Sequence, residues 1–168
     1  MEIREVIQSQ YLAALEMLEQ AIQHCPDALW DHPGDKNRFW HLSYHALFYT
    51  HLYLQNSEKE FSPWSKHRER YHSLEPLPQP PYDEPQIRDS YSKEEVLEYH
   101  RIVQEQVVEK IATLDLNGPS GFYWLPFSKA ELLLYNLRHI QQHTGELCER
   151  LGTQVNIDVE WVGTKAGI

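Results

Sequence analysis

Apolar residues recur at intervals of three and four along several stretches of the chain, which is the spacing of one face of an α-helix. The first stretch covers residues 3–25, contains neither Gly nor Pro, and is followed by Pro26. Its apolar stripe consists of Ile7, Tyr11, Ala14, Leu18, Ile22 and Cys25. We predict a long amphipathic helix that ends at Pro26, and a loop over residues 26–35 that contains Pro33 and Gly34.

A second helix is predicted over residues 36–55, where aromatic rings are unusually frequent. The rings belong to Phe39, Trp40, Tyr44, Phe48, Tyr49 and Tyr53. Apolar side chains cover most of the circumference of this helix instead of a single stripe. A helix of this kind lies at the centre of a helical domain, where neighbours cover it on most sides.

Residues 56–91 interrupt the helical pattern, and they hold six of the ten prolines. These prolines are Pro63, Pro76, Pro78, Pro80, Pro81 and Pro85. A connection of this length in a compact domain is uncommon unless it is functional or ordered against the body. We expect a short helical turn near residues 64–71 and an extended path elsewhere. Four aromatic residues are expected to anchor it: Phe61, Trp64, Tyr71 and Tyr82.

Two further helix starts carry a capping box, in which a Ser and a Glu three residues later satisfy backbone amides reciprocally. Ser92 and Glu95 open the third predicted helix, and Ser128 and Glu131 open the fourth. The third helix has its stripe at Val96, Val103, Val107, Ile111 and Leu114. The fourth has its stripe at Leu133, Leu137, Ile140, Thr144, Leu147 and Leu151. We expect Gly152 to be the residue that terminates the fourth helix.

The segments after the third and fourth helices differ from the helices in pattern. The third helix is expected to end before the Asn-Gly-Pro turn at 117–119, and an aromatic loop over 118–127 follows. The C-terminal tail alternates apolar and polar residues, with apolar side chains at Val155, Ile157, Val159 and Trp161. A period of two predicts a short extended segment that lies against the helices or against a partner chain.

Together these elements predict an all-α fold, and they form one domain over residues 1–168. The architecture is a four-helix bundle with a long Pro-rich connection between the second and third helices and a short extended C-terminal tail. Because that connection is long enough to reach a helix that is not adjacent, simple up-down-up-down order is not required.

Charge and composition narrow the classes of partner. The chain has 15 basic and 25 acidic residues, a formal net charge of −10, so nucleic acid is not expected as a partner. The N-terminus lacks the pattern of a secretory signal, and no stretch has the roughly 18 uninterrupted apolar residues of a membrane span. We therefore expect a soluble, cytoplasmic protein without a membrane partner. Cys25 and Cys148 are expected to be reduced, half-buried thiols.

The ten histidines are the unusual feature of the composition. Two pairs, His41 with His45 and His139 with His143, have the i, i+4 spacing that places both imidazoles on one helix face, where one cation can bridge them. Chance placement would give about 0.6 such pairs. The excess favours a metal site.

Position on the helices singles out three of these histidines. His139 and His143 flank the apolar seam of the fourth helix, and His45 lies in an apolar run of the second helix and can hardly avoid the interior. A buried histidine needs a hydrogen-bond partner or a metal. Three imidazoles from two facing helices would form the open three-ligand arrangement of catalytic zinc sites.

The other histidines are expected to have plainer roles. His100 lies on the stripe of the third helix and is expected to be a core residue. For His41 and His51 a metal role stays open. The histidines in loops or at helix ends are expected to be solvated, namely His24, His32, His67 and His72.

Two segments carry a family resemblance. Trp40-His-Leu-Ser-Tyr-His45-Ala-Leu-Phe, followed by Leu137-Arg-His139-Ile-Gln-Gln-His143-Thr-Gly-Glu-Leu147, resembles the DinB/YfiT-like superfamily of metal-binding four-helix-bundle proteins. The resemblance extends over about residues 1–152. It implies that one histidine of the second helix and two of the fourth bind the metal, which here are His45, His139 and His143. His41 remains the alternative ligand from the second helix, and Gln142 stands where relatives often have a further histidine.

The resemblance also implies a function. It implies one divalent transition metal, zinc or nickel, and a metal-dependent transferase or hydrolase that acts on a small organic substrate, with a low-molecular-weight thiol or water at the open coordination position. A non-catalytic metal-binding stress protein or a structural helical bundle is the alternative, and family members commonly form homodimers. The loop 122–127 and the connection 56–91 are expected to wall the pocket. Glu146 is a candidate general base, and Arg138 is a candidate partner for a small carboxylate.

Overall fold

The computed structural model describes residues 2–76 and 83–166, and over these residues it is helical with no strand. The elements are α1 (Ile3–His24), α2 (Asp27–Trp30), α3 (Phe39–Tyr53), the 3₁₀ helix η1 (Glu58–Glu60), α4 (Lys93–Thr113) and α5 (Lys129–Val155). The all-helical prediction is therefore confirmed for the part of the chain that is described. No helix in that part is long and apolar enough to cross a lipid bilayer.

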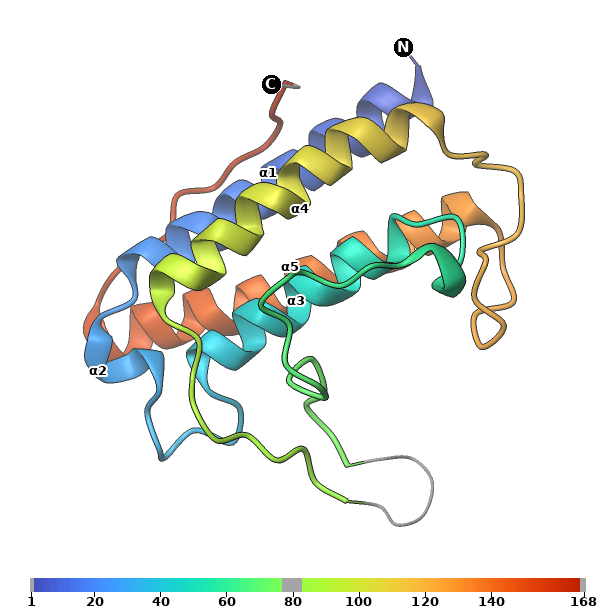
Figure 1. Ribbon diagram of the computed structural model, residues 1–168. Coiled ribbons are helices and arrows are strands. Elements are labelled where there is room, and N and C mark those ends of the chain that lie inside the picture. The colour runs from blue at the N-terminus through green and yellow to red at the C-terminus, as the bar shows by residue number, and fades with distance from the viewer. Residues whose placement is uncertain (1, 77–82, 167–168) are drawn as a thin grey trace.

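The four long helices lie side by side, and each packs against two others (Figure 1). α1 packs mainly on α4 and α5, and α3 packs on the same two helices from the other side. The consecutive helices α1 and α3 therefore lie across the diagonal. Each pair buries the apolar stripe that the spacing of the sequence predicts, which holds the helices together.

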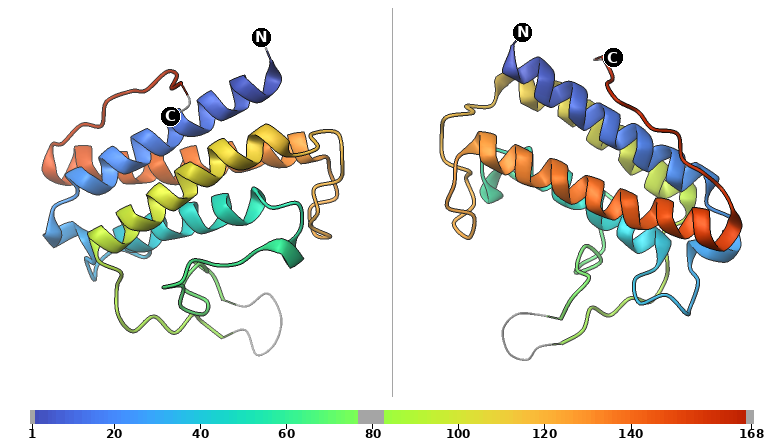
Figure 2. Two further views of the ribbon diagram at one scale, coloured as in Figure 1. Left: turned by 45° about the horizontal axis from the view of Figure 1, so that its top comes forward. Right: turned by 180° about the vertical axis from the view of Figure 1, so that it is seen from behind.

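The directions of the helices explain the long connection between α3 and α4. These two neighbours run the same way, so the chain that leaves the end of α3 has to return along the molecule to the start of α4 (Figure 1). A 15-residue helix is about 22 Å long, which no tight turn can span. The described residues of this connection, 54–76 and 83–92, lie on the outer side of the helices in the views of Figure 2.

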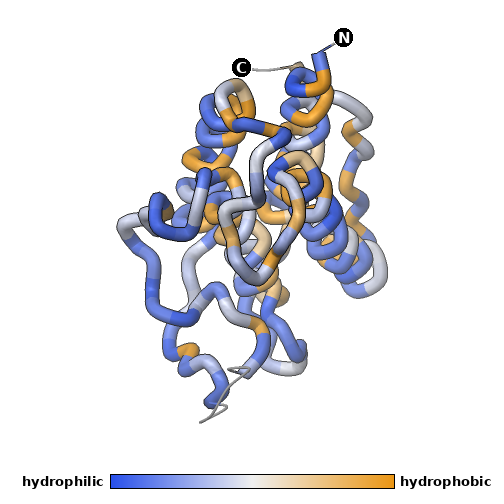
Figure 3. The backbone as a smooth tube through the Cα atoms, turned by 90° about the vertical axis from the view of Figure 1, so that its right-hand side faces the viewer, coloured by the Kyte–Doolittle hydropathy of each residue, from blue (hydrophilic) through white to orange (hydrophobic). Residues whose placement is uncertain are grey.

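α3 is buried on nearly every side, as its ring-rich sequence predicts. All of its residues except Tyr49 are buried. α4 and α5 cover two sides, and aromatic residues of the connection cover a third. Tyr91 lies 4.7 Å from Tyr44 between ring centroids, and Trp64 stacks on Tyr99 of α4 at 4.9 Å. The connection thus adds a wall to the core, although much of its chain is hydrophilic (Figure 3).

The predicted anchors of the connection have different outcomes. Trp64 and Tyr71 are buried, and Phe61 packs against the core while partly exposed. Tyr82 lies outside the described residues. The predicted helical turn at 64–71 does not form a helix there; only isolated turns occur at these residues, and η1 is the helical turn within the described residues of the connection.

Other boundaries also differ from the predictions. The loop predicted over 26–35 contains the short helix α2. The indole of Trp30, at the end of α2, donates a hydrogen bond of 2.8 Å to the carbonyl of Tyr91. Both bonds of the capping box form at Ser92, whereas at Ser128 only the bond from the backbone amide of Glu131 forms. Both helices nevertheless begin directly after the Ser that the sequence predicts as their cap.

Gly152 does not terminate α5, so that prediction is wrong. The helix continues to Val155, and Asn156 is the left-handed residue that ends it, with a φ of 54°. An Asn tolerates this conformation because its short polar side chain bonds locally. Gly152 is therefore an internal helical glycine, and a methyl group added there would meet no other atom.

The C-terminal tail lies extended along α1 (Figure 2). Gln10 donates a hydrogen bond of 3.0 Å to the carbonyl of Gly163, and Lys165 forms an ion pair with Glu16. The tail is therefore held by the chain's own helices, one of the two arrangements that its alternating pattern predicts. Trp161 nevertheless stays 76% exposed.

The loop between α4 and α5 is fixed to the end of α3. Lys129 is 2% exposed, and its ammonium group donates a hydrogen bond of 2.7 Å to the carbonyl of Gln55. Burial lowers the pKa of Lys129 to about 8. Gly121 has a φ of 88°, and a Cβ there would lie 1.7 Å from the carbonyl oxygen of Asn56. Only glycine allows this approach.

The two glycines predict opposite responses to the same substitution. Gly152→Ala is expected to stabilise the protein by about 0.5–1 kcal/mol, because a helical glycine costs that much relative to alanine. Gly121→Ala is expected to destabilise it by about 2 kcal/mol or more, because the methyl group meets the backbone of Asn56 and φ is positive. Urea denaturation measures both. A destabilising Gly152→Ala would contradict the continuous helix.

His100 and His51 are buried and have different hydrogen-bond partners. Nε2 of His100 donates a hydrogen bond of 2.9 Å to the carbonyl of Leu15, and His100 is the core residue that the sequence predicts. His51 contacts the hydroxyl of Tyr99 at 3.2 Å. Burial, aided by Lys110, lowers the pKa of His51 to about 4, and burial also lowers the pKa of His100.

These shifts predict how stability depends on pH. A histidine with a lowered pKa binds its proton more readily in the unfolded chain, so stability is full above the unfolded pKa of about 6.5 and decreases as pH falls toward the folded value. Each such histidine contributes about 1.4 kcal/mol per pH unit. For the metal-free protein, urea denaturation between pH 7 and 4 should show this slope. His51→Gln should make it shallower, and the exposed-site control His24→Gln should not.

Candidate metal centre

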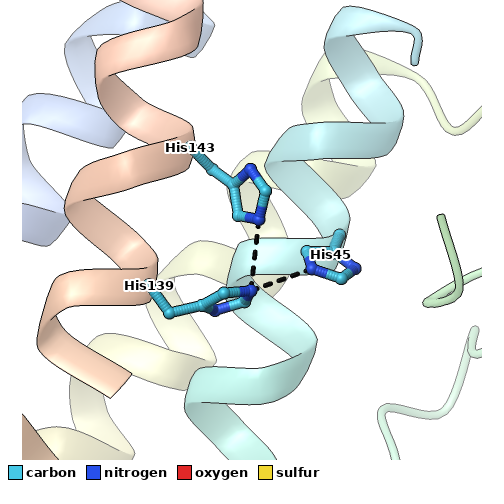
Figure 4. A group of neighbouring side chains, drawn as sticks. All are labelled: His45, His139 and His143. Carbon is cyan, nitrogen blue, oxygen red and sulfur yellow. Dashed lines mark hydrogen bonds between the residues drawn. The ribbon is translucent and has the colours of Figure 1, made fainter. Parts of the chain in front are cut away.

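Three imidazoles from two helices point toward one another (Figure 4). His45 lies near the middle of α3, and His139 and His143 lie one turn apart on α5, which packs against α3. Nε2 of His139 is 2.9 Å from Nε2 of His45 and 3.1 Å from Nε2 of His143. One nitrogen of each ring lies within 4.8 Å of the other two.

The outer nitrogen of His45 fixes the orientation of its ring. Nδ1 lies 2.6 Å from the backbone carbonyl of His72, in the connection between α3 and α4. A carbonyl only accepts, so Nδ1 carries the proton and donates it. Neutral His45 then presents the lone pair of Nε2 to the other two histidines. This arrangement, an outer hydrogen bond that sets the tautomer of a metal-facing imidazole, is usual in protein metal sites.

His143 has an acidic neighbour at its outer nitrogen. A carboxylate oxygen of Glu146 lies 3.5 Å from Nδ1 of His143, and the same oxygen accepts a hydrogen bond of 3.4 Å from Gln142. The carboxylate is therefore placed to favour a proton on Nδ1, which leaves Nε2 as a lone-pair donor. Glu146 acts on the orientation of His143 in this geometry.

All three histidines are held in the neutral form. Burial, followed by the neighbouring His139, lowers the pKa of His45 to about 2. Burial and His143 lower the pKa of His139 to about 4. Burial also lowers the pKa of His143, although Glu146 opposes the shift. Neutral imidazole is the form that binds a metal ion, so no ligand has to lose a proton at neutral pH.

The donor set fits a single divalent transition metal. Two nitrogens bound to a tetrahedral zinc ion at 2.0–2.1 Å lie about 3.4 Å apart, close to the Nε2 separations of this cluster. Without a cation, Nε2 of His139 carries one proton at most. It can therefore donate a hydrogen bond to only one of the two nitrogens beside it, those of His45 and His143. Nδ1 of His139 is buried and has no hydrogen-bond partner among the described residues, whereas Nδ1 of His143 has the carboxylate of Glu146 at 3.5 Å. A shared cation would satisfy all three inward nitrogens.

Two cavities adjoin the histidine cluster, and both are lined by His45 and Tyr49. The first, of about 230 Å³, also includes His139 and has tyrosines as its other walls. The second, of about 380 Å³, also includes His143 and is mainly polar. The remaining lining residues are Tyr53 and Tyr135 in the first cavity, and Asn37, Ser73, Leu74, Glu75, Gln142 and Glu146 in the second.

The residues that line these cavities contradict one prediction about the pocket walls and support another. The loop 122–127 lines neither cavity; several of its residues line a separate pocket at 119–127. The connection contributes residues 73–75 to the polar cavity. The loop is held at the end of α3 by Gly121, so it cannot reach the histidines near the middle of that helix.

The other histidines are distributed as follows. His41 is buried one turn before His45 and is not part of the cluster, and His51 is in the core. His24 and His32 are exposed, as predicted.

The prediction that His67 and His72 are solvated is wrong. Nδ1 of His67 lies 2.6 Å from the hydroxyl of Tyr44, and the ring of His72 stacks on Phe48 at 4.1 Å. Burial lowers the pKa of His72 to about 4. Both histidines belong to the connection, whose inner side faces the aromatic surface of α3, so their rings pack there instead of in water.

The contribution of His72 to the site could not be found from the sequence. It acts through its backbone carbonyl, a group that every residue has, so no residue type marks it. The sequence shows the tyrosines of the first cavity only as aromatic residues of two predicted helices. Their position beside the histidines depends on how α3 and α5 pack.

Comparison with known proteins agrees with the geometry. Residues 10–147 match the family model of the DinB superfamily, and this range includes all three histidines. A search of curated proteins and a search of solved structures found no match. The matched range is most of the chain, and the chain therefore belongs to the DinB superfamily.

Proposed function

We propose that His45, His139 and His143 bind one divalent transition metal, and that the protein is a metal-dependent enzyme that acts on a small organic substrate. The convergence of three Nε2 atoms from α3 and α5 carries this proposal. Imidazole ligands suit both zinc and nickel. Three protein ligands leave a coordination position open, which is the arrangement of catalytic sites.

The open position gives the site its chemistry. A divalent metal held by three imidazoles acts as a Lewis acid and lowers the pKa of a water or thiol at neutral pH. We therefore propose transfer to or from a low-molecular-weight thiol, or hydrolysis, as the reaction class. The two cavities beside the cluster would hold the substrate and the thiol.

Residues around the ligands have supporting roles in this proposal. The carbonyl of His72 orients His45, and the carboxylate of Glu146 orients His143. Glu146 also lines the polar cavity, although its contact with His143 makes it a positioning residue first. Tyrosines form the walls of the other cavity, beside His139. We further propose that the protein acts as a cytoplasmic homodimer.

Metal content tests the ligand set directly. Protein purified without a His tag is expected to carry about one metal ion per chain, because the three nitrogens are already arranged for it. His45→Ala, His139→Ala and His143→Ala should each lose most of it. His41→Ala and the exposed-loop control His32→Ala should keep it. Elemental analysis measures the stoichiometry, and retention of metal by His139→Ala would contradict the proposal.

Stability gives an independent measurement of the same site. Metal at 100 times its dissociation constant should raise the free energy of unfolding by about 2.7 kcal/mol, because only the folded chain brings the ligands together. Removal of the metal with a chelator should reverse the gain. The gain should be absent in His139→Gln. This variant keeps a polar side chain, so the test does not require that the fold tolerate alanine at this position.

The open coordination position separates an enzyme from a metal-binding protein without turnover. In the cobalt-substituted protein, an added thiol or azide is expected to shift the visible absorption bands, because it enters the open position. The His32→Ala protein, altered at an exposed loop position, serves as the matched control and should respond equally. Bands that do not respond to either ligand would contradict a catalytic role while leaving metal binding intact.

A further inference from the structure

A third cavity, of about 270 Å³, lies at the start of α3 and differs from the two beside the histidine cluster. Its walls come from the segment before α3 and from residues 84–90 at the end of the connection. The lining is mainly polar and charged, and it includes three cationic side chains, Lys36, Arg38 and Arg88. In a chain with a net charge of −10, such a gathering of cations is unusual.

The partners of these cations identify the one that is available to a ligand. Arg38 donates a hydrogen bond of 2.8 Å to the carbonyl of Asp31, and Lys36 lies 3.6 Å from the carboxylate of Glu75. The hydrogen bond of Arg88 among the described residues comes from its backbone amide, which donates to the hydroxyl of Tyr71, and its exposed guanidinium has no ion pair there. The carboxylates of the lining are those of Asp31 and Glu84.

The balance of charge indicates the kind of ligand. With Glu75 counted beside Lys36, the charges around the cavity balance, so a single added carboxylate suits the guanidinium of Arg88 better than a dianion does. A guanidinium matches the planar fork of a carboxylate with two parallel hydrogen bonds. The start of α3 adds to this field, since no side chain caps its first amides.

A buried polar group at the cavity provides a second, independent observation. His41 lines the cavity and is 6% exposed, yet its Nε2 has no hydrogen-bond partner among the described residues. A buried nitrogen without a partner is costly and is rare in folded proteins unless a ligand or water completes it. The ring of His41 is held in place by stacking on Trp40 at 4.9 Å.

The cavity is close to the histidine cluster. It shares Asn37 and Leu74 with the polar cavity that His45 and His143 line. On α3, His41 precedes His45 by four residues, a distance on the order of 6 Å along the helix axis. A short aliphatic chain spans this distance, so one small molecule can contact both places.

We propose that the cavity of Arg88 and His41 binds the carboxylate of a small organic substrate whose reacting end lies at the three-histidine centre. The proposal rests on the function proposed above and adds the chemical class of the substrate. Arg88 neutralises the carboxylate, His41 contacts it at the base of the cavity, and the shared walls lead the rest of the molecule to His45. Arg138, the arginine that the sequence suggested for a carboxylate, does not line this cavity.

The first test needs no metal. Metal-free protein labelled with ¹⁵N is titrated with butyrate, with neutral butyramide and with inorganic phosphate, and amide and indole shifts are followed by NMR. Butyrate should produce saturable shifts at Asn37, Arg88 and the indole of Trp40, and butyramide should produce none. Tighter binding of phosphate than of butyrate would overturn the assignment to a carboxylate.

Matched variants identify the residue responsible. Arg88→Gln should weaken butyrate binding about tenfold, since hydrogen bonds to a charged group are worth this much. Arg101→Gln removes the same charge from an exposed position on α4 and should bind butyrate like the unaltered protein. Equal butyrate affinity in the Arg88→Gln and unaltered proteins would overturn the proposal.

The second test connects the cavity to the metal centre. Cobalt-substituted protein is titrated with ω-mercaptocarboxylates of increasing chain length and with their neutral amides, and thiolate binding is read from the visible spectrum. One chain length should bind about tenfold more tightly than its amide, and Arg88→Gln should remove the difference. Equal binding of acid and amide at every length would overturn the link to the metal. Failure to bind cobalt would instead refute the proposed function. The titration of the metal-free protein would still test whether the cavity binds a carboxylate.

Discussion

The burial of α3 is the constraint on which the rest of the structure depends. A helix with aromatic side chains on nearly every side has no face that can be left in water, so it needs neighbours all round. α4 and α5 cover two sides of it. The third side is covered by the connection, whose buried rings Trp64, Tyr71 and Tyr91 pack there. The Pro-rich segment is thus part of the core.

The same constraint forms the histidine cluster. His45 is carried into the interior by the apolar residues around it on α3, where its outer nitrogen requires an acceptor. The connection that covers α3 supplies the carbonyl of His72. One segment therefore shields the aromatic helix and orients an imidazole of the site. Because of this contact, a substitution that moves the connection is expected to change the orientation of the His45 ring.

Helix direction links topology to function. Because α3 and α4 run parallel, the chain between them must travel the length of α3, and it passes both the histidine cluster and the cavity at the start of α3. A tight turn would have left both places open to solvent. The described residues of this connection form little regular structure, and its buried aromatic anchors offset the entropic cost of ordering it.

The sequence by itself determined the helices and the candidate ligands. Periodic apolar residues predicted the four long helices, and Ser92 and Ser128 predicted where two of them begin, because these signals are local. The i, i+4 spacing put His139 and His143 on one face of α5, and the apolar surroundings of His45 predicted its burial. Gly152 misled the prediction because the residue that ends a helix depends on its backbone conformation, and Asn156 adopts the left-handed one.

Only the tertiary structure decided which groups meet. The choice of His45 over His41 for the cluster depends on the axial position of α3 against α5, because the two histidines share one helix face and packing brings only His45 level with His139. The burial of His67 and His72 and the role of the carbonyl of His72 depend on the path of a connection that has no periodic pattern. Contacts between residues far apart in the chain come from packing that satisfies all helices at once, so no local pattern of residues could specify them.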